Sequence, residues 1–197
     1  MSPWQDESEL ALIRDWIYPS QAKSDIFDMV TEDNRPEAIA KVNIWTFKSH
    51  RTPTAIIATA DLTDALLQHQ KLARSNDSTR YRSVQFMLAF AFLRFVNSFV
   101  DRDIARASNA ALATSDVDDE DDDRSQSKAA EMRHRVSHGD VPDIQVLVKH
   151  AQEGLFWLRE RWWKTNAVGD PAKALRRHHA RREQWAEYES GQTEKRS

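Results

Sequence analysis

Apolar residues recur at helical spacing from residue 144 to residue 162, and this pattern constrains the fold more than any other feature of the chain. They mark one buried face over about five turns: Ile144, Leu147, Val148, Ala151, Leu155, Leu158 and Trp162. The chain contains only 4 glycines, and alternating runs of β-branched residues are missing. Because β-hairpins need both signals, the sequence predicts an all-α fold.

Three helices are predicted before residue 79 from their start signals and periodicity. Asp6, followed three residues later by Glu9, resembles a capping box that opens the first helix. Pro36 suits the first turn of a second helix, and Pro53 marks the break before a third. The N-terminal half of the chain therefore also reads as helices joined by short connections.

The most apolar helix is predicted from about Thr79 to Val100. Its apolar residues form a wide stripe that includes Phe86, Met87 and Phe90. A helix that is apolar nearly all round belongs at the centre of a bundle, so we expect these side chains to be buried.

Charge is strongly segregated along the chain. Residues 116–123 carry seven acidic side chains, and without them the net charge of −3 becomes −3 + 7 = +4. We interpret residues 112–128 as a disordered acidic insert. A calcium loop is the sharper alternative, but it needs a glycine where Asp121 stands and an acidic residue where Ser127 stands.

A basic stretch lies near the C-terminus, and we predict a basic helical or flexible extension over residues 166–197, after a helical domain over residues 1–165. Such stretches are often solvated helix faces or import signals, but they also permit a polyanionic partner. The candidate RNA-binding residues are Lys173, Arg176, Arg177, Arg181 and Arg182.

Several classes of protein are excluded or disfavoured by composition. The chain has no cysteine, which rules out disulfides, thiol nucleophiles and cysteine-bearing zinc sites. The first residues lack the pattern of a signal peptide, and the longest apolar run, residues 86–93, is far shorter than the ~20 residues that cross a bilayer. We therefore expect an intracellular protein without a membrane partner.

The densest polar cluster is Arg-His-Arg-Val-Ser-His-Gly at residues 133–139. It could simply close a helix, with cations near the negative end of the dipole and Gly139 as the cap. It could hold a metal through His134 and His138 on one helix face, although no Glu directly follows the first histidine and two arginines would repel a dication. Composition alone gives about 0.7 chance matches to Arg-x4-His, and requiring a histidine directly after the arginine lowers this to roughly 0.02.

A third interpretation of the cluster is metal-free cleavage of RNA. One neutral imidazole takes the proton of a ribose 2′-hydroxyl, whose oxygen attacks the adjacent phosphorus, and a protonated imidazole gives its proton to the departing 5′-oxygen. Arginine holds the non-bridging oxygens as their negative charge grows. Histidine suits both roles because both of its forms are populated near neutrality. The products are a 2′,3′-cyclic phosphate and a 5′-hydroxyl, and no cofactor is needed.

The geometry of this reaction adds a condition. His134 and His138 on one short helix lie on the same side of a phosphate, whereas in-line displacement needs acid and base on opposite sides. Two copies of the motif facing each other across a twofold axis satisfy this need. The mechanism therefore predicts a homodimer with a composite site.

The motif Arg133-His134-x-x-x-His138, at the end of a helix in an all-helical domain, resembles the Arg-x4-His motif of the HEPN nucleases. Flanking blocks over roughly residues 4–163 are similar to the Las-one-like (Las1-like) endoribonucleases of eukaryotic ribosome assembly. These blocks are Trp4, Glu9-Leu10, Arg14-Asp15-Trp16, Trp45, Arg51, Pro53, Ala55, Thr59, Leu93-Arg94-Phe95-Val96-Asn97, Asp101, Gly139-Asp140-Val141-Pro142 and Trp157-Leu158-x-x-Arg161-Trp162.

The resemblance implies a homodimeric HEPN-type helical bundle over residues 1–165 with Arg133, His134 and His138 as the catalytic set. It also implies cleavage of the second internal transcribed spacer of pre-ribosomal RNA in the nucleus and nucleolus. A polynucleotide 5′-kinase is the implied partner, because a 5′-hydroxyl end must be phosphorylated before a 5′-phosphate-dependent exonuclease can trim it. The alternative from another class is a catalytically inactive helical RNA-binding or scaffold module of a ribosome-assembly complex.

Overall fold

The computed structural model of the chain describes residues 2–19, 33–75, 78–100, 131, 134–135 and 141–194. Every regular element in these ranges is helical, so the all-α prediction is confirmed. The chain divides into two compact units, residues 1–52 with 159–197 and residues 53–158. The predicted acidic insert at 112–128 lies outside the described residues. In the same described ranges, no helix has the length and apolarity needed to cross a membrane.

The first unit is built around α1 (Glu7–Ile17). Its predicted cap is present, since the Asp6 carboxylate accepts a hydrogen bond of 3.1 Å from the backbone N–H of Glu9. α2 (Arg35–Lys48) has Pro36 in its first turn, as predicted, and it packs on α1. The unit ends with the short α8 (Lys164–Asn166) and the long α9 (Pro171–Glu194), which also packs on α1.

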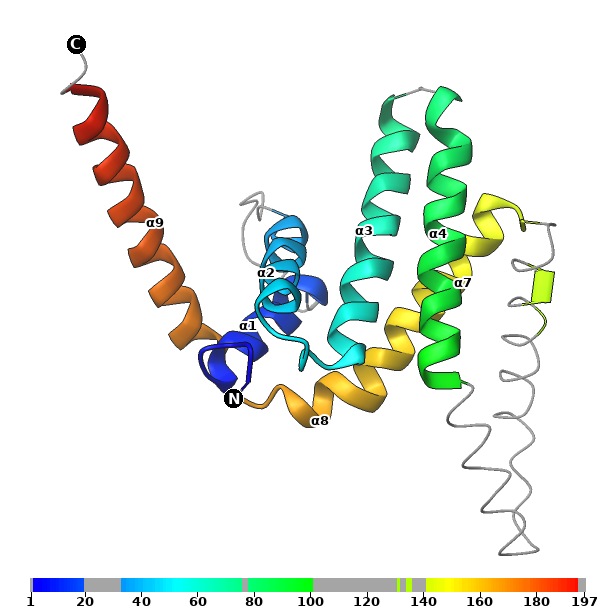
Figure 1. Cartoon of the computed structure of the whole chain (residues 1–197), viewed down its shortest axis with the longest axis horizontal. Helices are drawn as coiled ribbons and strands as arrows, with labels where there is room; N and C mark the ends of the chain where they lie inside the picture. Colours follow the sequence, from blue (N-terminus) through cyan, green and yellow to red (C-terminus); the bar gives the residue numbers. More distant parts are fainter. Residues whose placement is uncertain are drawn as a thin grey trace, which may run out of the picture. The chain divides into compact units, whose positions relative to one another are not determined.

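The second unit contains α3 (Thr54–Ser75), α4 (Tyr81–Phe95) and α7 (Ile144–Leu158), which pack on one another pairwise. In Figure 1, α3 and α4 run side by side and α7 crosses them. A single turn of 3₁₀-helix, Ser78–Arg80, leads into α4. The fully buried leucines of the unit's core come from all three helices: Leu62, Leu88, Leu147 and Leu158.

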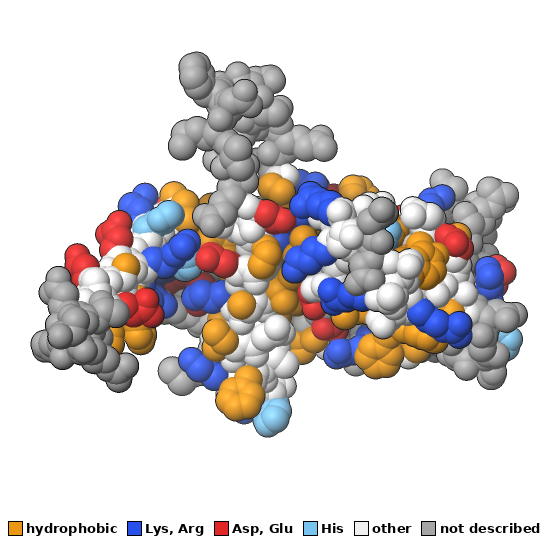
Figure 2. All heavy atoms as spheres, turned by 90° about the horizontal axis from the view of Figure 1, so that it is seen from above, with side chains coloured by type: hydrophobic (Ala, Val, Ile, Leu, Met, Phe, Trp, Pro, Cys, Tyr) orange, Lys and Arg blue, Asp and Glu red, His pale blue; other side chains and the backbone are white. Residues whose placement is uncertain are grey.

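The structure corrects the expected burial of α4. Phe86, Met87 and Phe90 are 47%, 42% and 61% exposed, so the helix does not lie at the centre of a bundle. Its contacts with α3 and α7 use the opposite face instead, which carries the buried residues Val84, Leu88, Ala91 and Phe95. Two neighbouring helices leave one side of a third uncovered, and this side of α4 is apolar. We call Phe86, Met87 and Phe90 the α4 stripe. Figure 2 shows hydrophobic side chains, in orange, at the surface of the part of the molecule that contains α3, α4 and α7, at the right of the view.

A π-helical turn corrects the predicted end of the last core helix. The buried face was expected to run to Trp162, but the turn Arg159–Trp163 follows Leu158 and has more residues than an α-helical turn. The wider turn shifts the buried position by one residue. Trp163 is therefore fully buried and Trp162 is only partly covered, and their rings meet edge to face at 5.0 Å.

Candidate functional site

The structure describes one of the three predicted catalytic side chains. His134 lies in helical backbone and its side chain is exposed to solvent. Arg133 and His138 lie outside the described residues. Exposure of an imidazole suits a group that must meet a large, charged substrate rather than support a core.

The chain that leaves the motif is anchored to the second unit just before α7. Pro142 is fully buried, and its carbonyl oxygen accepts a hydrogen bond of 2.8 Å from Nε2 of Gln85 on α4. The Asp143 carboxylate then accepts a hydrogen bond of 2.8 Å from the backbone N–H of Gln145, and its carbonyl accepts one from Leu147 at 3.1 Å. These bonds fix the chain four residues after His138 to both α4 and the start of α7.

A third histidine, His150, lies on α7 in the same unit. Its ring packs against Phe92 of α4 at a centroid distance of 5.4 Å, and its Nδ1 lies 3.0 Å from a carboxylate oxygen of Glu153. The sequence analysis did not single out His150, because a histidine beside an apolar helix face gives no distinctive signal. The contact with the Phe92 ring links α7 to α4, while Glu153 lies on α7 itself.

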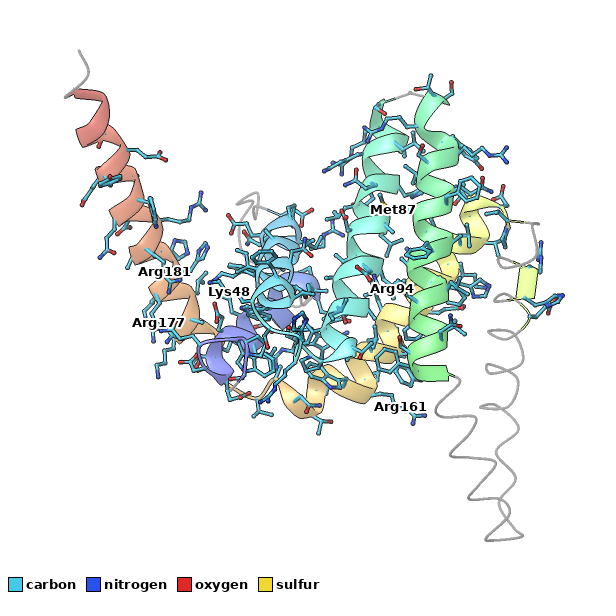
Figure 3. The ribbon with its side chains drawn as sticks, viewed as in Figure 1. Lys48, Met87, Arg94, Arg161, Arg177 and Arg181 are labelled. Atoms are coloured by element: carbon cyan, nitrogen blue, oxygen red, sulfur yellow. The ribbon has the colours of Figure 1, made fainter. Side chains whose placement is uncertain are left out.

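Asp61 and Arg94 form the ion pair that joins α3 to α4, with 2.8 Å between carboxylate and guanidinium. Burial raises the pKa of Asp61, and this effect outweighs the opposing attraction of Arg94, with the neighbouring Asp64 adding to the rise. In Figure 3, Arg94 and Met87 lie two turns apart on α4. Because this ion pair joins two helices of the same unit, we assign it to packing of the unit and not to chemistry.

The metal alternative for the motif rests on His134 and His138, and His138 lies outside the described residues. Among the residues placed by the structure, no three His, Asp or Glu side chains gather in a way that could hold a metal ion.

The five basic residues proposed for RNA binding all lie on α9, where the structure separates them. Arg177 donates a hydrogen bond of 2.8 Å to the Asp6 carboxylate, and Arg182 lies 3.5 Å from Glu37. Lys173, Arg176 and Arg181 are exposed, and none has an ion-pair partner within the described part of the chain. The sequence pattern therefore identified the basic helix, but only contacts distinguish its structural cations from its available ones.

Beside these residues, His178 is held between α9, α1 and α2. Its ring meets Trp16 edge to face at 5.1 Å, and Nε2 lies 3.6 Å from a Glu37 carboxylate oxygen. Burial lowers the pKa of His178, although Glu37 opposes this shift. The neutral ring thus serves as part of the α1–α9 packing.

Comparison with known proteins gives a consistent result. Residues 2–165 match the model of a protein family described as Las1-like. Over 174 residues the chain is 28% identical to Protein LAS1 of Saccharomyces cerevisiae, covering 85% of the chain and 32% of that relative. Over 170 residues it is 24% identical to the Pre-rRNA-processing protein las1 of Schizosaccharomyces pombe, with 85% and 32% covered. The chain thus spans about a third of the length of these curated relatives.

Proposed function

The chain belongs to the Las1-like family, and from this membership we propose that it is a metal-independent endoribonuclease of HEPN type that acts on pre-ribosomal RNA. The observation that carries the proposal is the motif Arg133-His134-x-x-x-His138, which lies inside the matched range. One relative is named a pre-rRNA-processing protein, which supports a role in ribosome biogenesis.

The proposed chemistry assigns a role to each residue of the motif. One of His134 and His138 accepts the proton of the ribose 2′-hydroxyl, and the other donates a proton to the departing 5′-oxygen. The P–O bond to the 5′-oxygen breaks as the bond to the 2′-oxygen forms, which leaves a 2′,3′-cyclic phosphate and a 5′-hydroxyl. Arg133 stabilises the negative charge on the non-bridging oxygens, which grows in the transition state.

A homodimer is part of the proposal, because acid and base must act from opposite sides of the phosphorus. The α4 stripe supports a second copy, since Phe86, Met87 and Phe90 form an exposed apolar surface on the compact unit that also carries His134. Burial of this stripe against its counterpart would remove apolar area from water. Arg82, whose guanidinium lies 5.6 Å from the Phe86 ring centroid, provides a polar border.

We further propose cleavage within the second internal transcribed spacer, in the nucleus and nucleolus, with a polynucleotide 5′-kinase as partner. These assignments rest on the family resemblance. They agree with the chemistry, because the 5′-hydroxyl product must be phosphorylated before a 5′-phosphate-dependent exonuclease can act on it. The rate of cleavage by the chain alone, compared with the rate in the presence of the kinase, would measure how far cleavage depends on this partner.

A catalytically inactive RNA-binding or scaffold module is the second candidate function. The exposed cations Lys173, Arg176 and Arg181 favour it, because they could bind RNA without any cleavage at the motif. In this case α9 would matter to the assembly and the motif would not.

A labelled spacer RNA distinguishes the two functions. We expect the purified chain, alone or with its kinase, to release a fragment ending in a 2′,3′-cyclic phosphate, with the rate unchanged in excess chelator. A substrate with a 2′-deoxy sugar at the cleaved position should remain intact, because its nucleophile is missing. Binding without any cyclic-phosphate product would favour the inactive module.

A further inference from the structure

One edge of α9 combines cations and aromatic rings in a regular order. Lys173, Arg177, Arg181 and Tyr188 are spaced by four, four and seven residues, so they follow one side of the helix. Trp185 lies one turn after Arg181, next to this line. We call these five residues the α9 stripe.

The cationic half of the stripe lies where α9 packs on the first unit. Arg177 and Arg181, one turn apart in Figure 3, line a small pocket together with Lys41 of α2 and Trp16 of α1. Glu9 also lines the pocket, but its carboxylate is bound by Lys41 at 2.7 Å. Arg181 remains an exposed guanidinium at this position, with no ion-pair partner in the described chain.

The aromatic half of the stripe lies beyond the packed part of α9. Trp185 and Tyr188 are 63% and 60% exposed, and their rings meet edge to face at 6.1 Å. Trp185 follows His178 by seven residues, so it continues the helix side that packs on α1, yet it is open to solvent. A large aromatic ring exposed at such a position offers its π-face to a ligand.

We infer that the α9 stripe binds single-stranded RNA. The exposed cations Lys173 and Arg181 hold backbone phosphates, while Arg177 stays bound to Asp6. The Trp185 and Tyr188 rings provide surfaces on which unpaired bases stack. The stripe extends about 22 Å along the helix axis, enough for a few nucleotides. The inference rests on the proposed function in that RNA is the substrate there, but it concerns binding and does not require cleavage.

The distribution of charge favours RNA over a protein ligand. Residues 171–182 contain five cations and no acidic side chain. The acidic residues of α9 stand in its second half: Glu183, Glu187, Glu189 and Glu194. Phosphates are therefore attracted only to the first half, whereas stacking on the aromatic rings needs no positive charge. A protein segment covering the same edge would have to bury the unpaired charges of Lys173 and Arg181 or supply matching acids.

The test measures binding apart from cleavage. A chain carrying His134→Ala is titrated against a fluorescent, unstructured RNA oligonucleotide, and anisotropy gives Kd at several salt concentrations. In this background we expect Trp185→Ala to weaken binding by about 5- to 150-fold with an unchanged salt slope, because it removes stacking on one or more bases. Trp185→Phe should retain most of the affinity.

Substitution of a cation should also weaken binding, but it should change the salt dependence of Kd. Arg181→Ala should weaken binding several-fold and lower the magnitude of the salt slope by about 0.7, the value for one phosphate contact on a single strand. Arg176→Ala, which removes a cation from another side of α9, should have a smaller effect. The matched controls outside the first half of α9 are Arg74→Ala, an exposed arginine on α3, and Phe47→Ala, a 92% exposed ring on α2.

Equal affinities for Trp185→Ala, Arg181→Ala and the two controls would overturn the inference, while cyclic-phosphate release by the unsubstituted chain would still support the nuclease. Sedimentation velocity of the same proteins gives a second criterion. If Trp185→Ala changes the oligomeric state and leaves RNA affinity intact, the edge is a protein interface and the inference is wrong.

Discussion

Arg177 on α9 and Asp6 before α1 lie 171 residues apart in sequence, yet a hydrogen bond of 2.8 Å joins the guanidinium to the carboxylate. The same carboxylate caps α1 by accepting the backbone N–H of Glu9 at 3.1 Å. One side chain therefore both starts the first helix and attaches the last. The Arg177 guanidinium, with the Glu9 N–H, holds the pKa of Asp6 well below its ordinary value, at about 2.

This lowered pKa predicts how acid affects the first unit. A carboxylate with a lower pKa in the folded state stabilises the fold fully above its unfolded pKa, near 3.8, and loses this contribution as pH falls through about 2. We expect the difference in urea midpoint between the wild type and Asp6→Asn to be constant above pH ~5 and to shrink steadily below it.

The control for this prediction is Asp15→Asn. Among the described residues Asp15 pairs only with its neighbour Arg14, at 2.7 Å, and its side chain is 45% exposed. Its removal should therefore change the midpoint little at any pH. A gap between the wild type and Asp6→Asn that persists unchanged at pH 2 would contradict the role of the Asp6 charge.

Gly169 and Gly154 should differ in how well they tolerate substitution by alanine. A Cβ at Gly169 would overlap the backbone carbonyl of Glu7, which cannot move without disturbing the start of α1. At Gly154 it would meet only side-chain atoms of Leu62 and Phe95, at 3.3 Å. We expect Gly169→Ala to destabilise the fold by about 1–3 kcal/mol. For Gly154→Ala we expect a change near zero, because the ~1 kcal/mol gain in helix propensity offsets the tighter packing. Urea unfolding of both variants checks this, and equal losses would contradict it.

Periodicity predicted the helices well because it depends on local sequence. Asp6, Pro36 and Pro53 each mark a helix start that the structure contains. The prediction of which side chains are buried was wrong in two places, for two different reasons. The π-helical turn Arg159–Trp163 buries Trp163 in place of the predicted Trp162, and the apolar periodicity of the sequence does not predict such a turn.

The predicted burial of the α4 stripe was wrong for the second reason. Hydrophobic side chains indicate a surface that is stabilised by burial, but the sequence does not say whether the chain itself or another molecule covers that surface. Of the candidate site, sequence could identify the motif and the basic helix, since both are local patterns. It could not separate the ion-paired Arg177 from the exposed Arg181, because their partners are far away in sequence.

The α4 stripe predicts the effect of a charge on self-association. Phe90→Glu places a carboxylate at the most exposed position of the stripe, where a second copy would have to desolvate it. We therefore expect dimers to dissociate and cleavage to fall with them. Phe47→Glu, at an exposed ring of the other unit, should change neither. Sedimentation velocity against protein concentration checks the first effect and an RNA cleavage assay the second. A Phe90→Glu chain that dimerises like the wild type would place the interface elsewhere.

The catalytic assignment predicts that each histidine is needed separately. Positioned proton transfer contributes about 10²- to 10⁴-fold per group. We therefore expect His134→Ala and His138→Ala each to lower the single-turnover rate of cleavage by at least about 10²-fold, while the dimers persist. Arg133→Lys should also be impaired, since an ammonium cannot bind two phosphate oxygens with a planar fork. Wild-type rates in both histidine variants would remove the motif from the mechanism, and a wild-type rate in Arg133→Lys would make that arginine structural.

The composite site can be tested directly with mixed dimers. If acid and base come from different copies, each dimer holds two phosphate sites, and one wild-type copy paired with one doubly substituted His134→Ala, His138→Ala copy leaves neither site with both groups. Cleavage by equal mixtures should then fall to about the quarter of dimers that are wild type on both sides, as random pairing gives. If each copy carried a complete site, the same mixture would keep half of the activity. Measuring the rate across mixing ratios therefore decides between a quadratic and a linear dependence on the wild-type fraction, and a linear result would rule out the shared site.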